Sequence, residues 1–492
     1  MSLEGIIVIL FCVVMILIGY LSSQKAKQSS ENFYLAGRKN TALMIAAGNV
    51  MGWVGSGTLI GAYGKAYFGG LSNGIWYIIG FGCSFILFAV VFAAPAKRLG
   101  DARGTTTFVE IWRHRFGTKF SAVWSVFQTI QDCAYCAGQV IAIALILDMF
   151  VGIPYHIACI GAAVIILIYV SLGGMEGSLR NTLVQMFLTF LGIIIAVAVG
   201  FKVGGGLTNM LANQLPQNWE PGLFTGQSVG SIIKLWLPVV LVAVTYNAEY
   251  MRTFAAKDRK HAVGAGWLSA FITIFVTLFT ACGIIVCVTQ AQGLETGDYA
   301  LIYMLKKLLP WGAPFFVAAI LSACMSTCSE AYLGNSAIFT KDVYKPLFKP
   351  SADDKQIMKV GRIYMIFFAA LSCVVAQMAG SVLSLMYFAC EMLSVCVPVF
   401  ICGFWWNRTT SQGAISGVLA GCLSFFIWSF IPGLNDIVAA LYVGLILSGM
   451  TVIVVSLLTP PPSKEELDYI RPFQTENWEK EEYKHKEPAV KE

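Results

Sequence analysis

The sequence predicts an all-α integral membrane protein with about thirteen transmembrane helices. Of its 492 residues, 57% are hydrophobic and only 12% are charged, and the mean hydropathy is +0.72. A soluble domain is about half apolar and about one-quarter charged, so a fold in water would lack polar residues for its surface. Apolar runs are spread evenly over residues 4–459, which favours one membrane domain at 1–459 over several soluble domains.

The spans follow from the lengths of the apolar runs, because crossing a bilayer takes about 20 predominantly apolar residues. The first run, from Ile6 to Leu21, has no basic residue before it and no small-residue cleavage motif after it. It is therefore interpreted as a retained span and not as a signal peptide. The predicted spans are 4–23, 41–64, 72–96, 119–150, 155–172, 174–201, 227–256, 261–290, 312–340, 359–380, 381–405, 411–432 and 437–459.

The orientation follows from Lys and Arg, which accumulate in cytoplasmic loops. If the N-terminus is outside, the loops assigned to the cytoplasm contain most of the basic residues and the outside loops contain few. The basic residues assigned to the inside include Lys25, Lys27, Arg38, Lys39, Lys97, Arg98, Arg252, Lys257, Lys341 and Lys345. Thirteen spans then place the charged tail, 460–492, in the cytoplasm, and its few large apolar residues predict disorder. The expected location is the plasma membrane.

A cytoplasmic segment from Thr105 to Phe116 has apolar and charged residues in an amphipathic order. One interpretation is a helix that lies in the plane of the membrane interface. The other is an ordinary loop between two spans, and the sequence leaves both open.

The second span is unusual because four glycines and Asn49 interrupt its apolar run between residues 46 and 58. Unwound backbone at mid-membrane depth is tolerated only where it lines a cavity or is buried in protein. Carbonyl groups freed in this way are good ligands for a cation. We therefore expect a binding site at this interruption, and the alternative is a kinked helix used only for packing.

The ninth span contains five polar side chains within residues 322–330, among them Ser326 and Thr327. Such hydroxyls can complete an oxygen cage for sodium or bond back to carbonyls of their own helix. We expect two interrupted helices to meet in mid-bilayer and to present neutral oxygens to one cation. Asp132 and Glu391 also lie within spans, where a charge costs at least about 2.5–3.5 kcal/mol. They are candidates for solute or proton contact, unless each is ion-paired or close to the interface.

Several motifs occur in a characteristic order: 32–38 (NFYLAGR) before the second span, 168–175 (IYVSLGGM) at the end of the fifth, and 337–344 (AIFTKDVY) at the end of the ninth. Together they resemble the motifs of the sodium:solute symporter family, which includes carriers of proline, sugars, sialic acid and pantothenate. The resemblance covers nearly the whole chain. It implies a leucine-transporter-type core of two inverted five-helix repeats, at about 41–201 and 227–405.

The resemblance also implies a sodium site, in which two carbonyls of the second span meet a carbonyl and two hydroxyls of the ninth. The matching positions are Ala47, Val50, Ala323, Ser326 and Thr327. Five neutral oxygens would replace the hydration of the ion without a carboxylate that would hold it too tightly. Family members with a further sodium site carry Asp in the sixth helix where this sequence has Thr182. One sodium ion per cycle is therefore expected.

For the solute, the resemblance to proline carriers places a cage tryptophan at Trp53 and a cage tyrosine at Tyr135. Two further aromatic positions of that cage fall on Val239 and Ala243, so the match is half kept, and packing roles for the two rings stay open. A sugar is disfavoured because Gly74 stands where sugar carriers have a glutamate. The expected solute is an amino acid or a small organic acid. The residues expected to contact it are Asn49, Trp53, Tyr135 and Gln139.

The expected function is sodium-coupled import of a small organic solute by alternating access. The alternatives are a proton-coupled carrier that uses Asp132 or Glu391, a sugar carrier, and a transporter-derived sensor. An enzyme is not expected, because the four histidines are scattered and the sequence has neither a phosphate-binding loop nor a metal-ligand motif. The expected partners are the solute, sodium and the lipid bilayer, with no nucleic acid.

Overall fold

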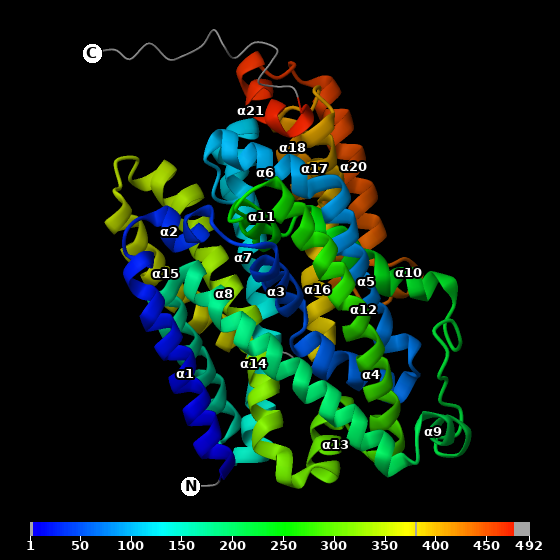
Figure 1. Cartoon of the computed structure of the whole chain (residues 1–492). Coiled ribbons are helices and arrows are strands. Elements are labelled where there is room, and N and C mark those ends of the chain that lie inside the picture. Colours follow the sequence, from blue (N-terminus) through cyan, green and yellow to red (C-terminus); the bar gives the residue numbers. More distant parts are fainter. Residues whose placement is uncertain (1–2, 379–380, 477–492) are drawn as a thin grey trace.

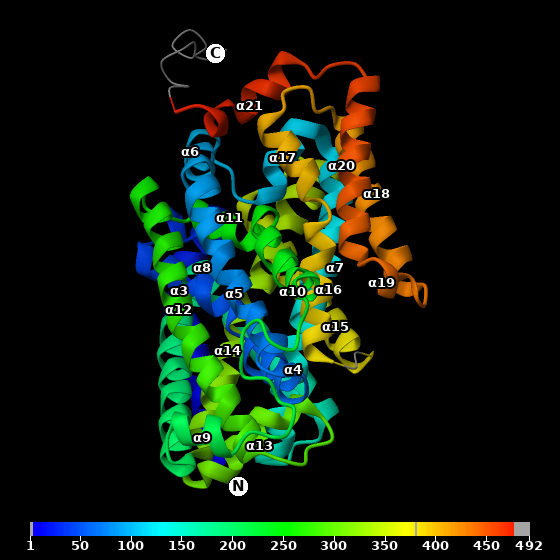
Figure 2. The ribbon, with the colours of Figure 1, turned by 90° about the vertical axis from the view of Figure 1, so that its right-hand side faces the viewer.

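The computed structural model describes residues 3–378 and 381–476, and its regular elements are helices packed into a tall bundle (Figures 1 and 2). The helices of the first half are α1 (Leu3–Ala26), α2 (Ser30–Leu35), η1 (Ala36–Arg38), α3 (Ala42–Trp53), η2 (Gly57–Gly61), α4 (Ala62–Gly69), α5 (Ser72–Leu87), η3 (Phe88–Phe92), α6 (Ala93–Arg103), α7 (Phe108–Val151), α8 (Tyr155–Gly204) and α9 (Leu207–Asn213).

The helices of the second half are α10 (Val229–Leu241), η4 (Val242–Val244), α11 (Asn247–Phe254), α12 (Arg259–Gln290), η5 (Gly297–Tyr299), α13 (Ala300–Leu308), η6 (Pro310–Gly312), α14 (Ala313–Ala337), η7 (Ile338–Phe348), α15 (Asp354–Met378), α16 (Val382–Ser394), α17 (Val397–Trp405), α18 (Ser411–Phe430), α19 (Leu434–Ile437), α20 (Ala440–Leu458) and α21 (Lys464–Gln474). Residues 379–380, at the end of the predicted tenth span, lie outside the described residues.

Ten helices of the described chain are long and apolar enough to cross a membrane, and two bent helix pairs raise that number to as many as twelve. The bent pairs are α3 with η2–α4, bent by 47°, and α10–η4 with α11, bent by 41°. The sequence predicted the first interruption. It did not predict the second, which the structure places at the polar residues that follow η4.

Helix α8 is 50 residues long, about 75 Å at 1.5 Å per residue, whereas the hydrocarbon core of a bilayer is about 30 Å thick. Its backbone leaves the helical conformation at Gly174, with φ 54° and ψ −150°. A Cβ atom here would lie 2.6 Å from the carbonyl oxygen of Phe33, so the break needs glycine for both its dihedral angles and its close contact with α2. The two parts of α8 diverge from this point (Figure 1).

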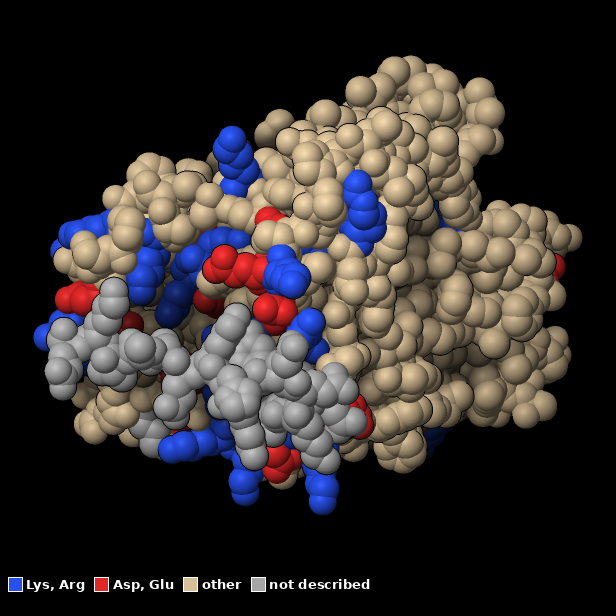
Figure 3. All heavy atoms as spheres, turned by 90° about the horizontal axis from the view of Figure 1, so that it is seen from above, with Lys and Arg blue, Asp and Glu red and all other residues tan. Residues whose placement is uncertain are grey.

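Charged side chains gather at one end of the bundle (Figure 3). Lys, Arg, Asp and Glu side chains gather at the end where α6 and α21 lie, as the view onto that end shows (Figures 1 and 3). We call it the basic end. The N-terminus, α9 and α13 lie at the opposite end (Figure 1). Helix α3 starts near the basic end and its continuation α4 lies toward the opposite end, whereas α11 lies nearer the basic end than α10 does.

The amphipathic segment before the fourth span forms the first part of α7, which breaks at Gly117 (φ 86°, ψ 171°). Its apolar side packs on protein rather than on lipid, and Trp112 is fully buried. The Trp112 ring lies 4.5 Å from that of Phe404 on α17, and the Phe108 ring lies 4.4 Å from that of Tyr250 on α11. The segment is therefore a helix and not an ordinary loop, and its apolar side is covered by α11 and α17.

The tail is also more ordered than predicted. Residues Lys464–Gln474 form α21, which starts with a capping box in which Ser463 and Glu466 satisfy each other's backbone N–H groups. Its buried Phe473 stacks on Phe404 with ring centroids 4.0 Å apart, and Arg98 NH2 donates to the Phe473 carbonyl at 2.9 Å. The expectation of disorder is therefore wrong for α21. The rest of that expectation falls on 477–492, outside the described residues.

Replacing Phe473 with alanine should loosen α21, since removing a buried phenylalanine typically costs about 3–5 kcal/mol. We expect a protease to release the tail from Phe473→Ala at least about tenfold faster than from the wild-type protein, because 1.4 kcal/mol already shifts an opening equilibrium tenfold. The solvent-exposed Lys464 provides the control, and Lys464→Ala should be cleaved at the wild-type rate. Equal cleavage of both variants would contradict the docking of α21.

Candidate functional site

Helix α3 ends at Trp53, and the way it ends leaves carbonyl oxygens free inside the bundle. The last turn of an α-helix has four carbonyls without partners in the helix. The Val54 N–H still reaches Val50 O at 2.8 Å, but the Gly55 N–H turns back to Trp53 O at 3.0 Å. The next carbonyl, that of Met51, is therefore open to side chains from other helices.

Both hydroxyls of α14 meet that carbonyl. Ser326 Oγ and Thr327 Oγ1 each lie 3.0 Å from Met51 O. They also lie 2.7 Å and 3.3 Å from the carbonyl oxygen of Ala323. All four residues are fully buried. We call these two carbonyls and two hydroxyls the oxygen cluster.

The chemistry of the oxygen cluster suits a small hard cation. Its oxygens are all neutral, and it lies at the C-terminal end of α3, where the helix dipole is negative. Half-helix C-termini and unwound carbonyls are the groups that coordinate sodium in transporters with broken helices. A divalent or transition metal would call for carboxylate, imidazole or thiolate ligands, and the described residues contain no group of three or more His, Cys, Asp or Glu side chains that could hold a metal ion.

The carbonyl of α3 that contacts the two hydroxyls is that of Met51, one residue beyond the expected Val50. Residues 47–50 lie within unbroken α3, so the expectation that Ala47 and Val50 sit in unwound backbone is wrong. The interruption begins at Val54, about one turn later, because the backbone there turns at φ −80° and ψ 73°. Helix α14 is continuous from Ala313 to Ala337 and is not the second interrupted helix. The structure does bring Ala323, Ser326 and Thr327 together with α3, but through Met51.

Gln139 of α7 holds the interruption open. Its side-chain carbonyl accepts from the Ser56 N–H at 2.7 Å and so caps the start of the second half-helix. Gly55 lies between, and a Cβ there would overlap Gln139 Oε1 and come within 2.9 Å of Thr327 Oγ1. Gln139 was expected to contact the solute, and in the structure its side chain bonds backbone beside the oxygen cluster.

Aromatic rings surround the end of α3. The Trp53 ring lies 5.9 Å from Phe81 on α5, 5.8 Å from Tyr135 on α7 and 5.7 Å from Tyr246 at the second helix break. The Tyr135 hydroxyl donates to Gly52 O at 3.0 Å. We call these four rings the aromatic cluster, and both predicted cage residues, Trp53 and Tyr135, belong to it.

Sequence reasoning missed the other rings of this region. The resemblance placed the two further cage positions at Val239 and Ala243, which are not aromatic. In the structure the additional ring is that of Tyr246, between η4 and α11. The hydroxyls of Tyr77, Tyr246 and Tyr387 are buried and have no hydrogen-bond partner within the described residues. Buried polar groups usually have partners, so these hydroxyls are candidates to bond a polar ligand or water beside the rings. The signal in the sequence was the polar triplet 245–247 within an apolar run.

A carboxylate adjoins the aromatic cluster. Trp53 Nε1 donates to Glu249 Oε1 at 3.4 Å, and Glu249 Oε2 has no hydrogen-bond partner within the described residues. Asn49, the remaining predicted solute contact, donates from Nδ2 to Ser269 Oγ at 3.2 Å and ties α3 to α12. The structure therefore pairs Asn49 with a neighbouring helix and gives Glu249 the polar position next to Trp53.

The two intramembrane carboxylates singled out from the sequence lie elsewhere. Asp132 of α7 accepts from the side-chain amides of Gln128, at 3.4 Å, and Asn335 of α14. Glu391 of α16 lies half-buried, and the positive charge of Lys234 on α10 acts on it. Neither is part of the oxygen cluster.

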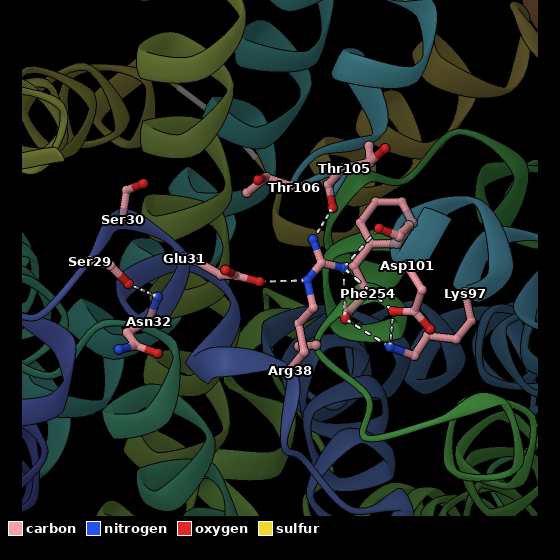
Figure 4. Close-up of polar contacts among 12 residues, drawn as sticks. Ser29, Ser30, Glu31, Asn32, Arg38, Lys97, Asp101, Thr105, Thr106 and Phe254 are labelled. Atoms are coloured by element: carbon pink, nitrogen blue, oxygen red, sulfur yellow. Dashed lines mark hydrogen bonds and ion pairs between the residues drawn. The ribbon is translucent and has the colours of Figure 1, made fainter. Parts of the chain in front are cut away.

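At the basic end, Arg38 joins four segments of the chain (Figure 4). Its guanidinium donates to Glu31 Oε1 at 2.7 Å, to Thr105 O at 2.8 Å and to Gly100 O at 3.2 Å. A further bond of 3.4 Å reaches the Phe254 carbonyl at the end of α11. These bonds tie η1 to four segments, namely α2, α6, the stretch just before α7, and α11, on the basic-end side of the oxygen cluster.

Sequence likeness now places this geometry in a known family. Residues 33–421 match the model of the sodium:solute symporter family. The chain belongs to that family. Its all-helical fold is that of leucine-transporter-type carriers, because it superimposes on a solved Na+-coupled sialic acid symporter in a substrate-bound outward-open state with a TM-score of 0.81. That likeness has 17% sequence identity and covers 94% of this chain and 99% of the other.

Curated relatives of this symporter are transporters and not enzymes. It is 27% identical over 491 residues to the high-affinity proline transporter PutP of Bacillus subtilis, covering 94% of this chain and 99% of the relative. It is 25% identical over 444 residues to the human high affinity choline transporter 1, covering 85% of this chain and 75% of the relative. This symporter is therefore a multi-pass transport protein of the cell membrane, as the sequence predicted.

Proposed function

We propose that this symporter imports a small solute bearing a positively charged nitrogen, in the first place an amino acid, together with one sodium ion. The observation that carries the proposal is the convergence of Met51 O, Ala323 O and the hydroxyls of Ser326 and Thr327 directly beside the aromatic cluster. An ion at the oxygen cluster and a solute at the aromatic cluster would both contact the interrupted end of α3. Each would then favour the same arrangement of that helix, which is the requirement for coupled binding.

The proposal of a single ion rests on Thr182. Its hydroxyl donates to the Ser178 carbonyl of its own helix at 2.9 Å, and Ser178 Oγ lies 3.0 Å from Ser329 Oγ. This region thus offers hydroxyls that already have hydrogen-bond partners, where a second sodium site would call for a carboxylate. One ion moving across 100 mV supplies about 2.3 kcal/mol, enough for a roughly 50-fold accumulation of a neutral solute.

The proposal for the solute rests on charge. Aromatic faces attract cations, and a buried carboxylate such as that of Glu249 favours a cation and disfavours an anion. Glu249 Oε2 is an unused acceptor next to the Trp53 ring. An ammonium group matches both features, so an amino acid is favoured over a small organic acid. The proline and choline named for the two relatives also carry a positively charged nitrogen.

We further propose thirteen spans with the basic end in the cytoplasm. Counting the two parts of α8 as separate spans adds one to the twelve obtained with the bent pairs. An odd number of spans puts the N-terminus outside and the tail inside. The two bent pairs open the repeats expected at 41–201 and 227–405, and they run in opposite directions, α3 away from the basic end and α11 toward it (Figure 1). This arrangement supports inverted repeats.

The proposed function is tested by uptake into proteoliposomes. A panel of radiolabelled amino acids, quaternary amines and organic acids is offered with an inward sodium gradient, with an inward proton gradient, and with neither. We expect uptake of at least one ammonium-bearing solute with the sodium gradient alone. Uptake driven by the proton gradient in the absence of sodium would refute sodium coupling. It would favour the proton-coupled alternative, for which Asp132, bonded only to amides in the described structure, is the candidate group.

Glu249 should control the solute and not the ion. In Glu249→Gln the acceptor for Trp53 Nε1 remains but the negative charge is lost, so the half-saturating solute concentration should rise about tenfold or more. The half-saturating sodium concentration should change less than about threefold. Glu249→Asp, which keeps the charge, is the control. Its half-saturating solute concentration should lie between those of the wild type and Glu249→Gln. A change in sodium affinity without one in solute affinity would contradict this assignment.

A further inference from the structure

An ion pair lies directly beyond the oxygen cluster on its basic-end side. Glu330 follows Thr327 by three residues on α14, so its carboxylate lies about one helical turn closer to the basic end. There it forms a close ion pair with Arg252 of α11. Both side chains are inaccessible, with 7% and 2% of their surfaces exposed. Charged groups at this depth are expensive, so their presence calls for a role in the ion or solute pathway.

The pair fills the space between three helices of the site. A Cβ at Gly52 of α3 would come within 3.3 Å of Arg252 NH1 and 2.5 Å of Glu330 Oε2. A Cβ at Gly48, one turn closer to the basic end, would lie 2.9 Å from Arg252 Cδ and 3.4 Å from Glu330 Oε1. The pair therefore runs along α3 from the residue next to Met51 toward the basic end. An ion that leaves the oxygen cluster in this direction meets Glu330 and Arg252 first.

Arg252 has a second carboxylate within reach. Glu249 precedes it by three residues on α11, a spacing that places two side chains on the same face of a helix. Glu249 Oε2 has no hydrogen-bond partner within the described residues, and the Glu330 carboxylate is held by its ion pair with Arg252. Two carboxylates and one guanidinium leave one carboxylate without an ion-pair partner, whichever of the two Arg252 contacts. Arg252 can thus exchange Glu330 for Glu249. The guanidinium keeps an ion-pair partner, and the Glu330 carboxylate becomes free.

We propose that the Arg252–Glu330 pair is the inner barrier of the sodium pathway, and that Glu330 receives the departing ion while Arg252 moves to Glu249. This inference rests on the sodium coupling proposed above. In the closed arrangement Arg252 neutralises Glu330 and blocks the route. When the ion moves one turn along α14, the carboxylate replaces the hydroxyls as its ligand, and the negative charge of Glu249 holds the displaced guanidinium.

The proposal predicts opposite effects from the two halves of the pair. Glu330→Gln leaves Arg252 positive next to the oxygen cluster, so sodium should bind more weakly, by about tenfold or more. Arg252→Gln leaves Glu330 negative, so sodium should bind more tightly by a similar factor. Solute uptake by Arg252→Gln should nevertheless be slower, because the ion is released slowly. The double variant Arg252→Gln/Glu330→Gln should return sodium affinity to within about threefold of the wild-type value.

The measurement is the sodium chloride concentration that gives half-maximal thermal stabilisation of the purified full-length protein, at constant ionic strength with N-methyl-D-glucamine chloride. Uptake rates in proteoliposomes are measured in parallel. Glu176→Gln neutralises the i,i+4 pair with Arg180 on the surface of α8 and is the control, with unchanged sodium affinity. If Arg252→Gln does not fold, Glu330→Asp takes its place. Its shortened carboxylate should slow uptake at least about tenfold while sodium affinity stays within about threefold.

Shifts of sodium affinity in the same direction for both single variants would overturn the proposal. If the pair only held helices together, losing either partner would change sodium affinity in the same direction. A double variant that is worse than either single variant would overturn it as well. These outcomes differ from a failure of the proposed function itself. If sodium does not stabilise the wild-type protein, and Ser326→Ala and Thr327→Ala behave as the wild type does, the coupling to sodium is refuted and the barrier with it.

Discussion

Removing both hydroxyls of the oxygen cluster should abolish sodium-stimulated uptake. In Ser326→Ala/Thr327→Ala two of the four oxygens are lost, and each lost ligand is worth about 1.5–3 kcal/mol for a bond to a charged partner. The half-saturating sodium concentration should therefore rise by more than about 100-fold, beyond the range in which uptake can be measured. The check is solute uptake into proteoliposomes over a sodium titration.

Two further variants separate this loss from a loss of folding. Ser372 of α15 is also fully buried, and its hydroxyl bonds the Phe368 carbonyl of its own helix at 2.9 Å. Ser372→Ala removes the same atom from a site of the same burial and should keep the wild-type sodium dependence. Thr327→Ser retains the hydroxyl and should restore at least half of the uptake lost in Thr327→Ala. Sodium-driven uptake that survives in the double variant would place the ion elsewhere.

A single methyl group at Gly55 should have an effect of similar size. Alanine there would push its Cβ into the side-chain carbonyl of Gln139 and toward Thr327 Oγ1, 2.9 Å away. Over-packing of this kind costs about 1–3 kcal/mol, and its relief would displace either the cap on Ser56 or a hydroxyl of the oxygen cluster. We expect Gly55→Ala to reduce sodium-stimulated uptake at least about tenfold while the protein remains folded, as judged by its elution as a single species in detergent.

The matched control is Gly161→Ala on α8. A Cβ at this glycine meets no other atom within 4 Å. The substitution should leave uptake unchanged and stabilise the helix by up to about 1 kcal/mol, because alanine loses less conformational entropy than glycine in a helix. If Gly55→Ala also transported normally, the narrow fit among α3, α7 and α14 would not be required for function.

The composition, the spacing of apolar runs and the glycines of the second span predicted the class of fold and the first helix break. These features act locally, since they reflect the length of a span and the helix propensity of single residues. The position of the break within 46–58 was not predictable to the residue, because it depends on a partner from another helix. Gln139 of α7 caps Ser56, and without that contact the same glycines could open the helix a turn earlier.

The second break and its aromatic residue were missed for a related reason. Tyr246 approaches Trp53 only because the α10–η4 and α11 pair is bent, and the prediction of this span did not use its local signals, Pro238 inside α10 and the polar triplet 245–247. The pair of Arg252 and Glu330 was equally hidden. Seventy-eight residues separate them in the sequence, and only the packing of α11 on α14 brings their charges together. Local patterns locate the residues that do chemistry, but their partners emerge from tertiary packing.

The docking of α21 determines where this chain can be shortened or extended. Thr105 gives its carbonyl to Arg38 and pairs its hydroxyl with Tyr469 at 3.0 Å, so one residue connects the tail to the arginine that ties four segments together. Affinity tags fused beyond Gln474 should leave this connection intact, whereas a truncation just after the last apolar helix would sever it. C-terminal additions are therefore best attached after α21, whether they are purification tags, fusion partners or antibody epitopes.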